Sequence, residues 1–568
     1  MGRYTESHES GRAFIGDGME VKRSADIPMS ATWTPGGFGG REEDGIAVRH
    51  EADIRESASV AHIYGQNLVA AESLTAIGNT WAYAPERLKP TADFMLASGL
   101  NRFVIHTSVH QPVDDKIPGL GLGPFGQWFT RHETWAEQAK PWIDYLARSS
   151  YVLQQGNFVA DIIYIYGQGS NLTALFGSQL PPIPEGYNYD FLNAGAVANV
   201  LSVEDEQIVT ETGMSYRILA LDESAWFMTW PVLKKIEELV RVGAVIVGPK
   251  PINTPSLNDD EAEFLKLADL LWGEGKGMKE TGKGKVYAGS SLEEVLTDLG
   301  IEPDFKYSGN APETKMRFVH RSLGDQDIYW VNTSNGESSQ VKVSLRISGK
   351  EPEVWNPVDG SISPVSYTID NGRTEVTLKM DPQDALFVIF RKPTNKNSSV
   401  VPEVVESERT TIKGEWEVRF QPGRGAPEKA AFNELTPWNE SENPGIKYFS
   451  GTAEYIKTIN IPEEWISDNS KLWLDLGEVY NLAEVAVNAE SLGIVWKKPF
   501  RVCISEGLKP GENRLSVKIT NLWVNRLIGD QQPGIANPLT YTMQAFYRVD
   551  SPLLSSGLLG PVKIVARK

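Results

Sequence analysis

The sequence has a single cysteine, Cys503, among its 568 residues. One cysteine excludes an intramolecular disulfide framework and a cysteine-ligated zinc site. No run of about 18 apolar residues occurs, so no helix is expected to span a membrane. Basic residues are fewer than acidic ones, 55 against 74, which leaves a net charge of −19. Because a strongly acidic chain binds phosphate backbones poorly, we expect no nucleic-acid partner.

Other signals are missing as well. The first ten residues, MGRYTESHES, contain no basic segment followed by an apolar one, so we expect no secretory signal peptide in this chain. Gly248-Pro249-Lys250 lacks the glycine spacing of a nucleotide-binding loop, so we assign no nucleotide cofactor there. What is present is an ordinary globular composition, 41% hydrophobic and 23% charged, long enough for three or four domains at ~100–200 residues each.

The first 155 residues are predicted to be α/β, with parallel strands joined by helical crossovers. The expected strands are 3–8, 26–32, 67–74 and 102–107, and the expected helices are 54–64 and 84–98. Polar residues end each strand, and a (β/α) barrel has its chemistry at that end. Only about four strands are found where a closed barrel needs eight, so we expect a partial (β/α)8 barrel, either incomplete or with its first half upstream of this chain.

The rest of the chain is predicted to form three more domains and a linker. Residues 156–300 have the pattern of a small doubly wound α/β domain, similar to flavodoxins or amidotransferases. Residues 301–395 have alternating strands at short intervals, typical of an antiparallel β-sandwich. Residues 396–408 are polar and are interpreted as a linker, and 409–568 form a second β-rich domain. The predicted fold class is therefore multidomain, α/β plus all-β.

Several motifs together resemble one family. They are Ala70-Ala-Glu72-Ser73, His106-Thr-Ser-Val-His110-Gln-Pro, Gly121-Leu-Gly-Pro-Phe-Gly126 and Phe158-Val-Ala-Asp161. Residues 1–200 thereby resemble the α-L-rhamnosidases of glycoside hydrolase family 106. Gly414-Glu-Trp416, Leu476-Gly-Glu-Val-Tyr480 and Asn521-Leu-Trp523-Val-Asn525 resemble the jelly-roll sugar-binding domain of such enzymes and of β-galactosidase-like hydrolases.

The resemblance implies a function and a setting. It implies inverting hydrolysis of terminal α-L-rhamnosides by a catalytic barrel, a rhamnose-containing oligosaccharide or glycoside as the substrate, and a periplasmic or extracellular location. It also implies a bound calcium ion. Asp114 and Asp115 are a pair of loop acids that can ligate calcium through oxygen, but a solvated charge pair is the commoner outcome, so the metal ligands stay unassigned.

Glycoside hydrolysis needs two carboxyl groups across the scissile bond. Glu72 is the first candidate, because it follows the buried run Leu68–Ala71 and has the small neighbours Ala71 and Ser73, which leave room for a ligand. We expect it to activate water as a base, although the role of acid stays open. Glu6 is the second candidate, at a position that matches the family. A structural carboxylate, or a frayed one near the terminus, is the alternative for each.

Six residues are predicted to bind substrate. His106, His110 and Gln111 follow a strand end and suit hydrogen bonds to sugar hydroxyls, with a structural histidine as the alternative. Trp33 and Trp128 lie beside glycine-rich loops and can cover the apolar methyl group of rhamnose, although core packing is the commoner role of a tryptophan. His8 is included because it lies in the stretch 4–8 that matches the family.

Four tryptophans of the last domain, Trp416, Trp438, Trp496 and Trp523, are either a carbohydrate platform or buried sandwich residues, and we favour burial. Two other functions stay open for the whole chain. One is a non-catalytic carbohydrate-binding protein, because half a barrel leaves only the β domains intact. The other is a different glycosidase, for example a β-galactosidase-like enzyme, because the accessory domains are shared.

Overall fold

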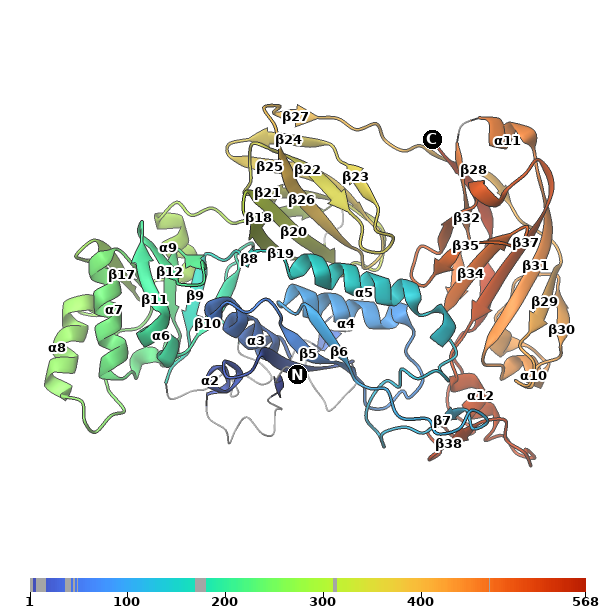
Figure 1. Ribbon diagram of the computed structural model, residues 1–568, viewed down its shortest axis with the longest axis horizontal. Coiled ribbons are helices and arrows are strands. Elements are labelled where there is room, and N and C mark those ends of the chain that lie inside the picture. The colour runs from blue at the N-terminus through green and yellow to red at the C-terminus, as the bar shows by residue number, and fades with distance from the viewer. Residues whose placement is uncertain are drawn as a thin grey trace.

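The computed structural model describes residues 17–35, 50–168, 180–309, 314–468 and 470–568, and the backbones of short strands at 4–6, 42–43 and 46–47. The chain forms four units (Figure 1). A central α/β unit contacts the other three, which are a second α/β unit at one end, a β-sandwich above and a second β-sandwich at the other end. In the described residues no helix is long and apolar enough to cross a membrane.

The central unit has one sheet of four parallel strands in the order β1-β2-β5-β6. The strands are β1 (Tyr4–Glu6), β2 (Ile27–Trp33), β5 (Ala70–Thr75) and β6 (Arg102–Ile105); the helices are α2 (Gly18–Lys22), α3 (Glu51–Tyr64), α4 (Pro85–Ala97) and α5 (Lys140–Leu153); the short strands β3 (Glu42–Glu43), β4 (Ile46–Ala47) and β7 (Pro118–Gly119) lie in loops. The four parallel strands and the two helices expected between them are therefore present.

Local sequence explains where these helices begin and end. Pro85 starts α4, and the fixed φ of proline suits the first turn of a helix. Gly65 ends α3 with a left-handed φ of +77°, which glycine adopts without strain. One face of the sheet packs on the helices, because Ala71 of β5 is buried with Ile54 of α3 and Met95 of α4.

The second α/β unit has a six-stranded sheet in the order β10-β9-β14-β15-β17-β16, in which only β16 is antiparallel. Its elements are β9 (Ile162–Ile165), β10 (Tyr189–Leu192), α6 (Ala194–Val200), β14 (Ile218–Leu221), α7 (Trp230–Val242), β15 (Val245–Val247), α8 (Glu261–Trp272), β16 (Gly277–Thr281), β17 (Gly284–Ala288) and α9 (Leu292–Asp298), with a small sheet of β11 (Leu201–Glu204), β12 (Gln207–Thr210) and β13 (Ser215–Tyr216). His62 of α3 joins this unit to the central one, since its Nδ1 lies 2.8 Å from Oδ1 of Asp190 on β10.

The third unit is a sandwich of two antiparallel sheets around a core that includes Tyr329, Val343 and Phe390. One sheet holds β18 (Phe305–Gly309), β21 (Ser339–Leu345), β25 (Arg373–Met380), β24 (Tyr367–Asp370) and β27 (Ser398–Ser399); the other holds β23 (Ile362–Pro364), β22 (Lys350–Trp355), β26 (Ala385–Pro393), β20 (Gln326–Thr333), β19 (Met316–Leu323) and β8 (Asn157–Phe158). The segment interpreted as a linker, 396–408, contributes β27 to this sandwich and begins β28 of the next unit.

The last unit is a second antiparallel sandwich. Its smaller sheet holds β28 (Glu406–Thr411), β40 (Lys563–Arg567), β32 (Lys471–Asp475) and β36 (Arg501–Cys503); its larger sheet holds β30 (Lys429–Phe432), β29 (Trp416–Phe420), β31 (Thr452–Ile461), β37 (Gly511–Thr520), β34 (Leu482–Val487) and β35 (Glu490–Val495). Smaller elements are α10 (Pro444–Lys447), α11 (Glu463–Ser467), β33 (Glu478–Tyr480), α12 (Val524–Gly529), β38 (Tyr541–Thr542) and β39 (Gly557–Gly560). The broad prediction of a multidomain α/β plus β protein is confirmed.

This last sandwich is packed firmly against the central unit. Trp496 is 2% exposed, and its ring centre lies 5.2 Å from that of Trp142 and 5.6 Å from that of Tyr145, both on α5. Trp523 and Leu527 pack on Trp81 and Trp128 of the central unit. Shared aromatic cores of this kind fix two units relative to one another, since separating them exposes large apolar surfaces.

Candidate active site

Glu72 lies on the face of the central sheet that the helices leave uncovered. Successive side chains of a strand point to opposite faces, and Ala71 packs on α3 and α4. Glu72 therefore points the other way, in register with Ala31 of β2 and Val104 of β6. Val104 is 37% exposed, so this face is open beside Glu72.

One oxygen of Glu72 is held by a neighbour. Oε1 accepts a hydrogen bond of 2.7 Å from the hydroxyl of Thr75. The side chain is half-buried, and no cation forms an ion pair with it in the part of the chain that the structure describes. The carboxylate is thus oriented by one hydrogen bond, while its other oxygen stays available to a ligand.

The second carboxyl candidate is placed only by its backbone. Glu6 ends β1 and pairs with Met29 of β2, two residues before Ala31, which is the partner of Glu72. The two glutamates are therefore at neighbouring levels of one sheet, separated by β2. His8 falls outside the described residues, so its predicted contact with substrate stays a prediction.

His106 sits directly after β6, beside a tight glycine. Its backbone N–H donates to the carbonyl of Ser73 at 2.9 Å, which ties it to the end of β5. Its Nδ1 is buried without a hydrogen-bond partner among the described residues. Gly126 has a φ of +97°, and a Cβ there would lie 3.4 Å from this nitrogen and 2.9 Å from Thr107. A larger residue at 126 would therefore push against Thr107, the neighbour of His106.

The other two loop residues differ from His106. His110 is exposed. Gln111 is 6% exposed, and its amide both donates to the carbonyl of Leu120 at 2.7 Å and accepts from the N–H of Leu120 at 2.9 Å. The predicted substrate contact of Gln111 is therefore corrected to a structural role, because its amide closes the loop.

Of the two tryptophans predicted to contact sugar, Trp33 is partly exposed and Trp128 is buried. Trp33 is half-buried at the end of β2, with its ring centre 6.0 Å from that of Phe125. Trp128 is 1% exposed, donates from Nε1 to the carbonyl of Phe125 at 2.9 Å and packs on Trp81. The predicted sugar contact of Trp128 is corrected: the glycine-rich loop comes close because it covers this ring, since a Cβ on Gly121 would lie 2.6 Å from it.

The four tryptophans of the last sandwich are all buried, at 2% exposure or less (Trp416, Trp438, Trp496 and Trp523). They form its core and its contact with the central unit, as the favoured alternative expected.

The calcium ion implied by resemblance finds no ligand set in the described ranges. No three His, Cys, Asp or Glu side chains there lie close enough together to hold a metal ion. Asp114 is exposed and forms an ion pair of 2.6 Å with Arg131, and that guanidinium holds the pKa of the carboxyl below its usual range. Asp114 and Asp115 therefore form no such cluster within the described ranges, so the calcium ion stays a prediction and we derive no chemistry through it.

The sequence analysis missed two residues of this unit, the hydroxyl residue Thr75 and the acid Glu133. Thr75 orients Glu72, and its only signal was a hydroxyl three residues after the glutamate. Glu133 is 4% exposed, and burial raises its pKa to about 8. It accepts hydrogen bonds from the N–H of Thr134 at 3.0 Å and from the amide of Gln127 at 3.2 Å. Nothing in the sequence separates Glu133 from a surface acid.

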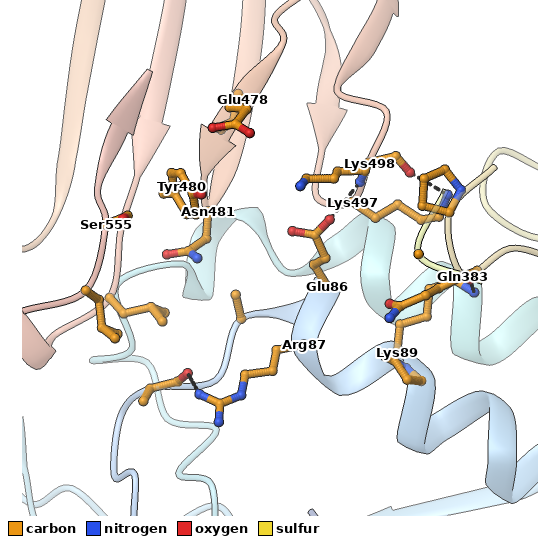
Figure 2. Close-up of a pocket in the computed structure, with 18 of the residues that line it drawn as sticks. Glu86, Arg87, Lys89, Gln383, Glu478, Tyr480, Asn481, Lys497, Lys498 and Ser555 are labelled. Atoms are coloured by element: carbon orange, nitrogen blue, oxygen red, sulfur yellow. Dashed lines mark hydrogen bonds between the residues drawn. The ribbon is translucent and has the colours of Figure 1, made fainter. Parts of the chain in front are cut away.

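A cavity of about 750 Å³ lies where the central unit meets both sandwiches (Figure 2). Glu86 and Arg87 come from α4, Gln383 from the first sandwich, and Tyr480 and Asn481 from the second. None of the predicted site residues lines it.

Polar groups of this cavity largely bond to one another across the boundaries. The N–H of Lys498 donates to Glu86 at 3.0 Å, and Lys89 donates to the carbonyl of Gln383 at 2.7 Å. Burial raises the pKa of Glu86. These bonds make the cavity a junction that holds three units together.

Comparisons with known proteins show what the chain is similar to. The sequence model of glycoside hydrolase family 106, alpha-L-rhamnosidase, matches residues 1–369. A solved structure of the rhamnosidase from Novosphingobium sp. PP1Y is 42% identical with a TM-score of 0.93, covering 99% of this chain and 53% of that one. A Formosa agariphila protein with the name "Putative beta-glucuronidase" is 28% identical, over 96% of this chain and 66% of the relative.

The chain thus spans about half the length of the solved rhamnosidase and about two thirds of the Formosa protein. The family match covers well over half of its residues. This chain belongs to glycoside hydrolase family 106, the α-L-rhamnosidases.

Proposed function

We propose that this chain is a glycoside hydrolase that removes terminal α-L-rhamnose, with Glu72 in its active site. The observation that carries the proposal is the position of Glu72, a half-buried carboxylate on the uncovered sheet face, oriented by Thr75 and unpaired with any cation in the described ranges. In this fold class, strand ends hold catalytic groups to a fraction of an ångström.

The central sheet is proposed to be four strands of a (β/α)8 barrel. The four strands are parallel, helices cover one face, and β1 and β6 are its outer strands in the described part of the chain. The uncovered face would then be the barrel interior, and the carboxyl ends of the strands would be the catalytic rim.

The proposed chemistry is a single displacement with inversion. Glu72 takes a proton from a water molecule, the oxygen of that water bonds to the anomeric carbon, and the glycosidic C–O bond breaks. A second carboxylic acid protonates the leaving oxygen, from about 6.5–9.5 Å across the sugar. Glu6 is the candidate within this chain, because only β2 separates its backbone from β5.

His106 and Trp33 are proposed to position the sugar. The imidazole of His106 is partly exposed and can bond a ring hydroxyl, and Trp33 offers a partly exposed aromatic face for the C5 methyl group. A rhamnose-containing oligosaccharide or glycoside is the proposed substrate, in a periplasmic or extracellular location.

A second glycosidase activity is kept as a candidate because of the name of the Formosa relative. The carbohydrate-binding alternative is kept because the two sandwiches are complete while the sheet is not closed.

Hydrolysis of aryl glycosides tests these functions. We expect this chain to release the aryl group from an α-L-rhamnoside, with β-L-rhamnose as the first product seen by NMR, and to act more slowly on β-glucuronides and β-galactosides. Glu72→Gln should lower turnover by ~10²–10⁴-fold, while Glu20→Gln, an exposed glutamate of the same unit, should leave it unchanged.

Three outcomes contradict the proposal. Equal turnover by Glu72→Gln removes Glu72 from the chemistry. Faster hydrolysis of another glycoside favours the second candidate. Rhamnose binding without turnover, unchanged by Glu72→Gln, favours a carbohydrate-binding protein.

A further inference from the structure

A second pocket, of about 330 Å³, lies between the central unit and the last sandwich. His132, Glu133 and Gln138 line it from the segment between β6 and α5. Gln421 and Arg424 line it from the loop after β29. The indole N–H of Trp523 donates to the carbonyl of His132 at 2.8 Å and so holds the two sides together.

Several polar groups of this pocket are buried without partners. The side chain of His132 is 7% exposed; its Nε2 lies 3.7 Å from an oxygen of Asp114, and its Nδ1 is buried without a partner among the described residues. The amide oxygen of Gln138 and one terminal nitrogen of Arg424 are also buried without a partner. A buried polar group without a partner is unfavourable, so a ligand that supplies matching groups is stabilised there.

The junction cavity of Figure 2 differs from this pocket in how its polar groups are paired. There, Glu86 accepts from Lys498 and Lys89 bonds to Gln383, so polar groups already satisfy one another. The pocket around His132 is instead lined by residues of both units that carry buried polar atoms without a hydrogen-bond partner among the described residues. The first arrangement joins units, and the second suits recognition of a small polar molecule.

The charge of the pocket is set by Arg424. Its guanidinium lies 4.2 Å from the ring centre of Trp523 and forms no ion pair within the described ranges, and burial lowers its pKa to about 10. Two other cations of the lining already have carboxylate partners: Arg131 pairs with Asp114 at 2.6 Å, and Lys518 with Glu484 at 3.3 Å.

The buried acid of the lining does not cancel this charge. Burial raises the pKa of Glu133 to about 8, so its carboxyl is mostly protonated at neutral pH. Glu137 is exposed at the pocket, where water screens its charge. The inner part of the pocket therefore presents one uncompensated cation on an aromatic ring, which favours an anion, and above all a planar carboxylate that pairs with guanidinium through two oxygens.

We propose that this pocket binds a single sugar-acid ring, with its carboxylate on Arg424 and its hydroxyls on His132 and Gln138. A volume of about 330 Å³ is at the lower end of small-ligand sites, ~300–1,000 Å³, so it suits one ring rather than a chain. The site stands apart from Glu72, and it does not depend on hydrolysis by this chain.

Isothermal titration calorimetry with four probes tests this: D-glucuronate, D-galacturonate, L-rhamnose and acetate. We expect at least one uronate to bind at least tenfold more tightly than acetate and rhamnose. Arg424→Gln should weaken that uronate at least tenfold, and Gln138→Leu should weaken it less. The matched control is Arg419→Gln, because Arg419 is an exposed arginine of the same sandwich that pairs with Glu417.

Circular dichroism and thermal unfolding show whether each variant is folded. If Arg424→Gln is unfolded, Arg424→Lys is used instead, and we expect it to weaken uronate through loss of the two-oxygen pairing. The proposal is overturned if neither uronate binds, if rhamnose or acetate binds as tightly as the better uronate, or if the folded Arg424 variant binds uronate like the wild type.

Discussion

The hydroxyl of Thr75 donates a hydrogen bond to Oε1 of Glu72, three residues earlier on the same strand. In a regular strand, residues three apart point to opposite faces. Here Leu74 has a left-handed φ of +64°, and the pairing of β5 with β2 shifts register at this point. The irregularity turns Thr75 back toward Glu72, and it lies at the end of the strand where chemistry is proposed.

The first prediction follows from that bond. Thr75→Val removes the donor with little change in shape, and a hydrogen bond to a charged group is worth about 1.5–3 kcal/mol. We expect kcat to fall by ~10–100-fold with a small change in KM, because the carboxylate loses its orientation. Thr75→Ser keeps the hydroxyl and should retain most of the activity. Equal rates for the Val and wild-type proteins would show that the bond is not used.

The second prediction separates the two tryptophans at the sheet edge. Trp128→Ala should lower the free energy of unfolding by about 3–5 kcal/mol, because a fully buried indole is removed. Trp33→Ala should raise KM and lower stability less, since Trp33 is half-buried. Urea unfolding and steady-state kinetics measure both. If Trp128→Ala is folded and stable but has a raised KM, then Trp128 contacts the sugar, in contradiction to the packing role assigned from its burial.

The third prediction concerns pH and His320 in the first sandwich. Its Nδ1 lies 2.8 Å from Asp304 and its Nε2 3.2 Å from Asp327, and these carboxylates raise the pKa of the buried imidazole to about 9 against the effect of burial. The folded protein therefore holds a proton that the unfolded chain releases near pH 6.5. The stabilisation is present below that pH and is lost as pH rises through about 9.

The size of this effect is on the order of 3 kcal/mol. Thermal unfolding from pH 6 to pH 9.5 should show a falling Tm in the wild type and a flatter profile in His320→Gln. His110→Gln, which alters an exposed histidine, is the matched control for stability. Parallel profiles in all three proteins would contradict the assignment.

The fourth prediction concerns Glu133, whose pKa is raised to about 8 by burial. Between about pH 4.5 and 8 the folded protein keeps a proton on this carboxyl that the unfolded chain has lost, so stability falls as pH rises through that range. Glu133→Gln is neutral throughout, and its Tm should exceed that of the wild type by a margin that grows toward pH 8. Glu137→Gln, at an exposed neighbour, should show no such growing margin.

The fifth prediction tests the contact between the central unit and the last sandwich. Trp496→Ala leaves a cavity beside Trp142 and Tyr145, so we expect the two units to unfold in separate calorimetric transitions. Trp465→Ala is the control, because Trp465 is a partly buried residue that packs against the core of the same sandwich; the variant should lower the stability of the sandwich without separating the units. A single transition in Trp496→Ala would mean that other contacts are enough to make the two units unfold together.

Periodicity in the sequence was enough to predict the four parallel strands, the helices between them and the two β-rich units. The end of a buried strand also indicated Glu72, because strand direction determines which residues reach the rim. These features depend on patterns a few residues long, which the local backbone decides.

Long-range packing explains the errors. Trp128 stands beside glycines in the sequence, but Trp81, Phe546 and Trp523 enclose it from distant parts of the chain. Gln111 was predicted to bind sugar hydroxyls, yet its loop folds back so that its amide nitrogen and oxygen both bond to the backbone of Leu120. Arg424 could not be predicted as a binding residue from the sequence, because its surroundings are formed only when two units pack together.

The small parallel pairing of β7 with β38 has a consequence for biosynthesis. Tyr541 pairs with Pro118, more than four hundred residues earlier, and the N–H of Tyr541 donates to the carbonyl of Ile117. Since a ribosome synthesises a polypeptide from its amino end, the stretch between β6 and α5 cannot form this pairing before residue 541 has been synthesised. Nascent chains halted before residue 541 should therefore leave this stretch open to proteases, even where the sheet that bears it has already folded.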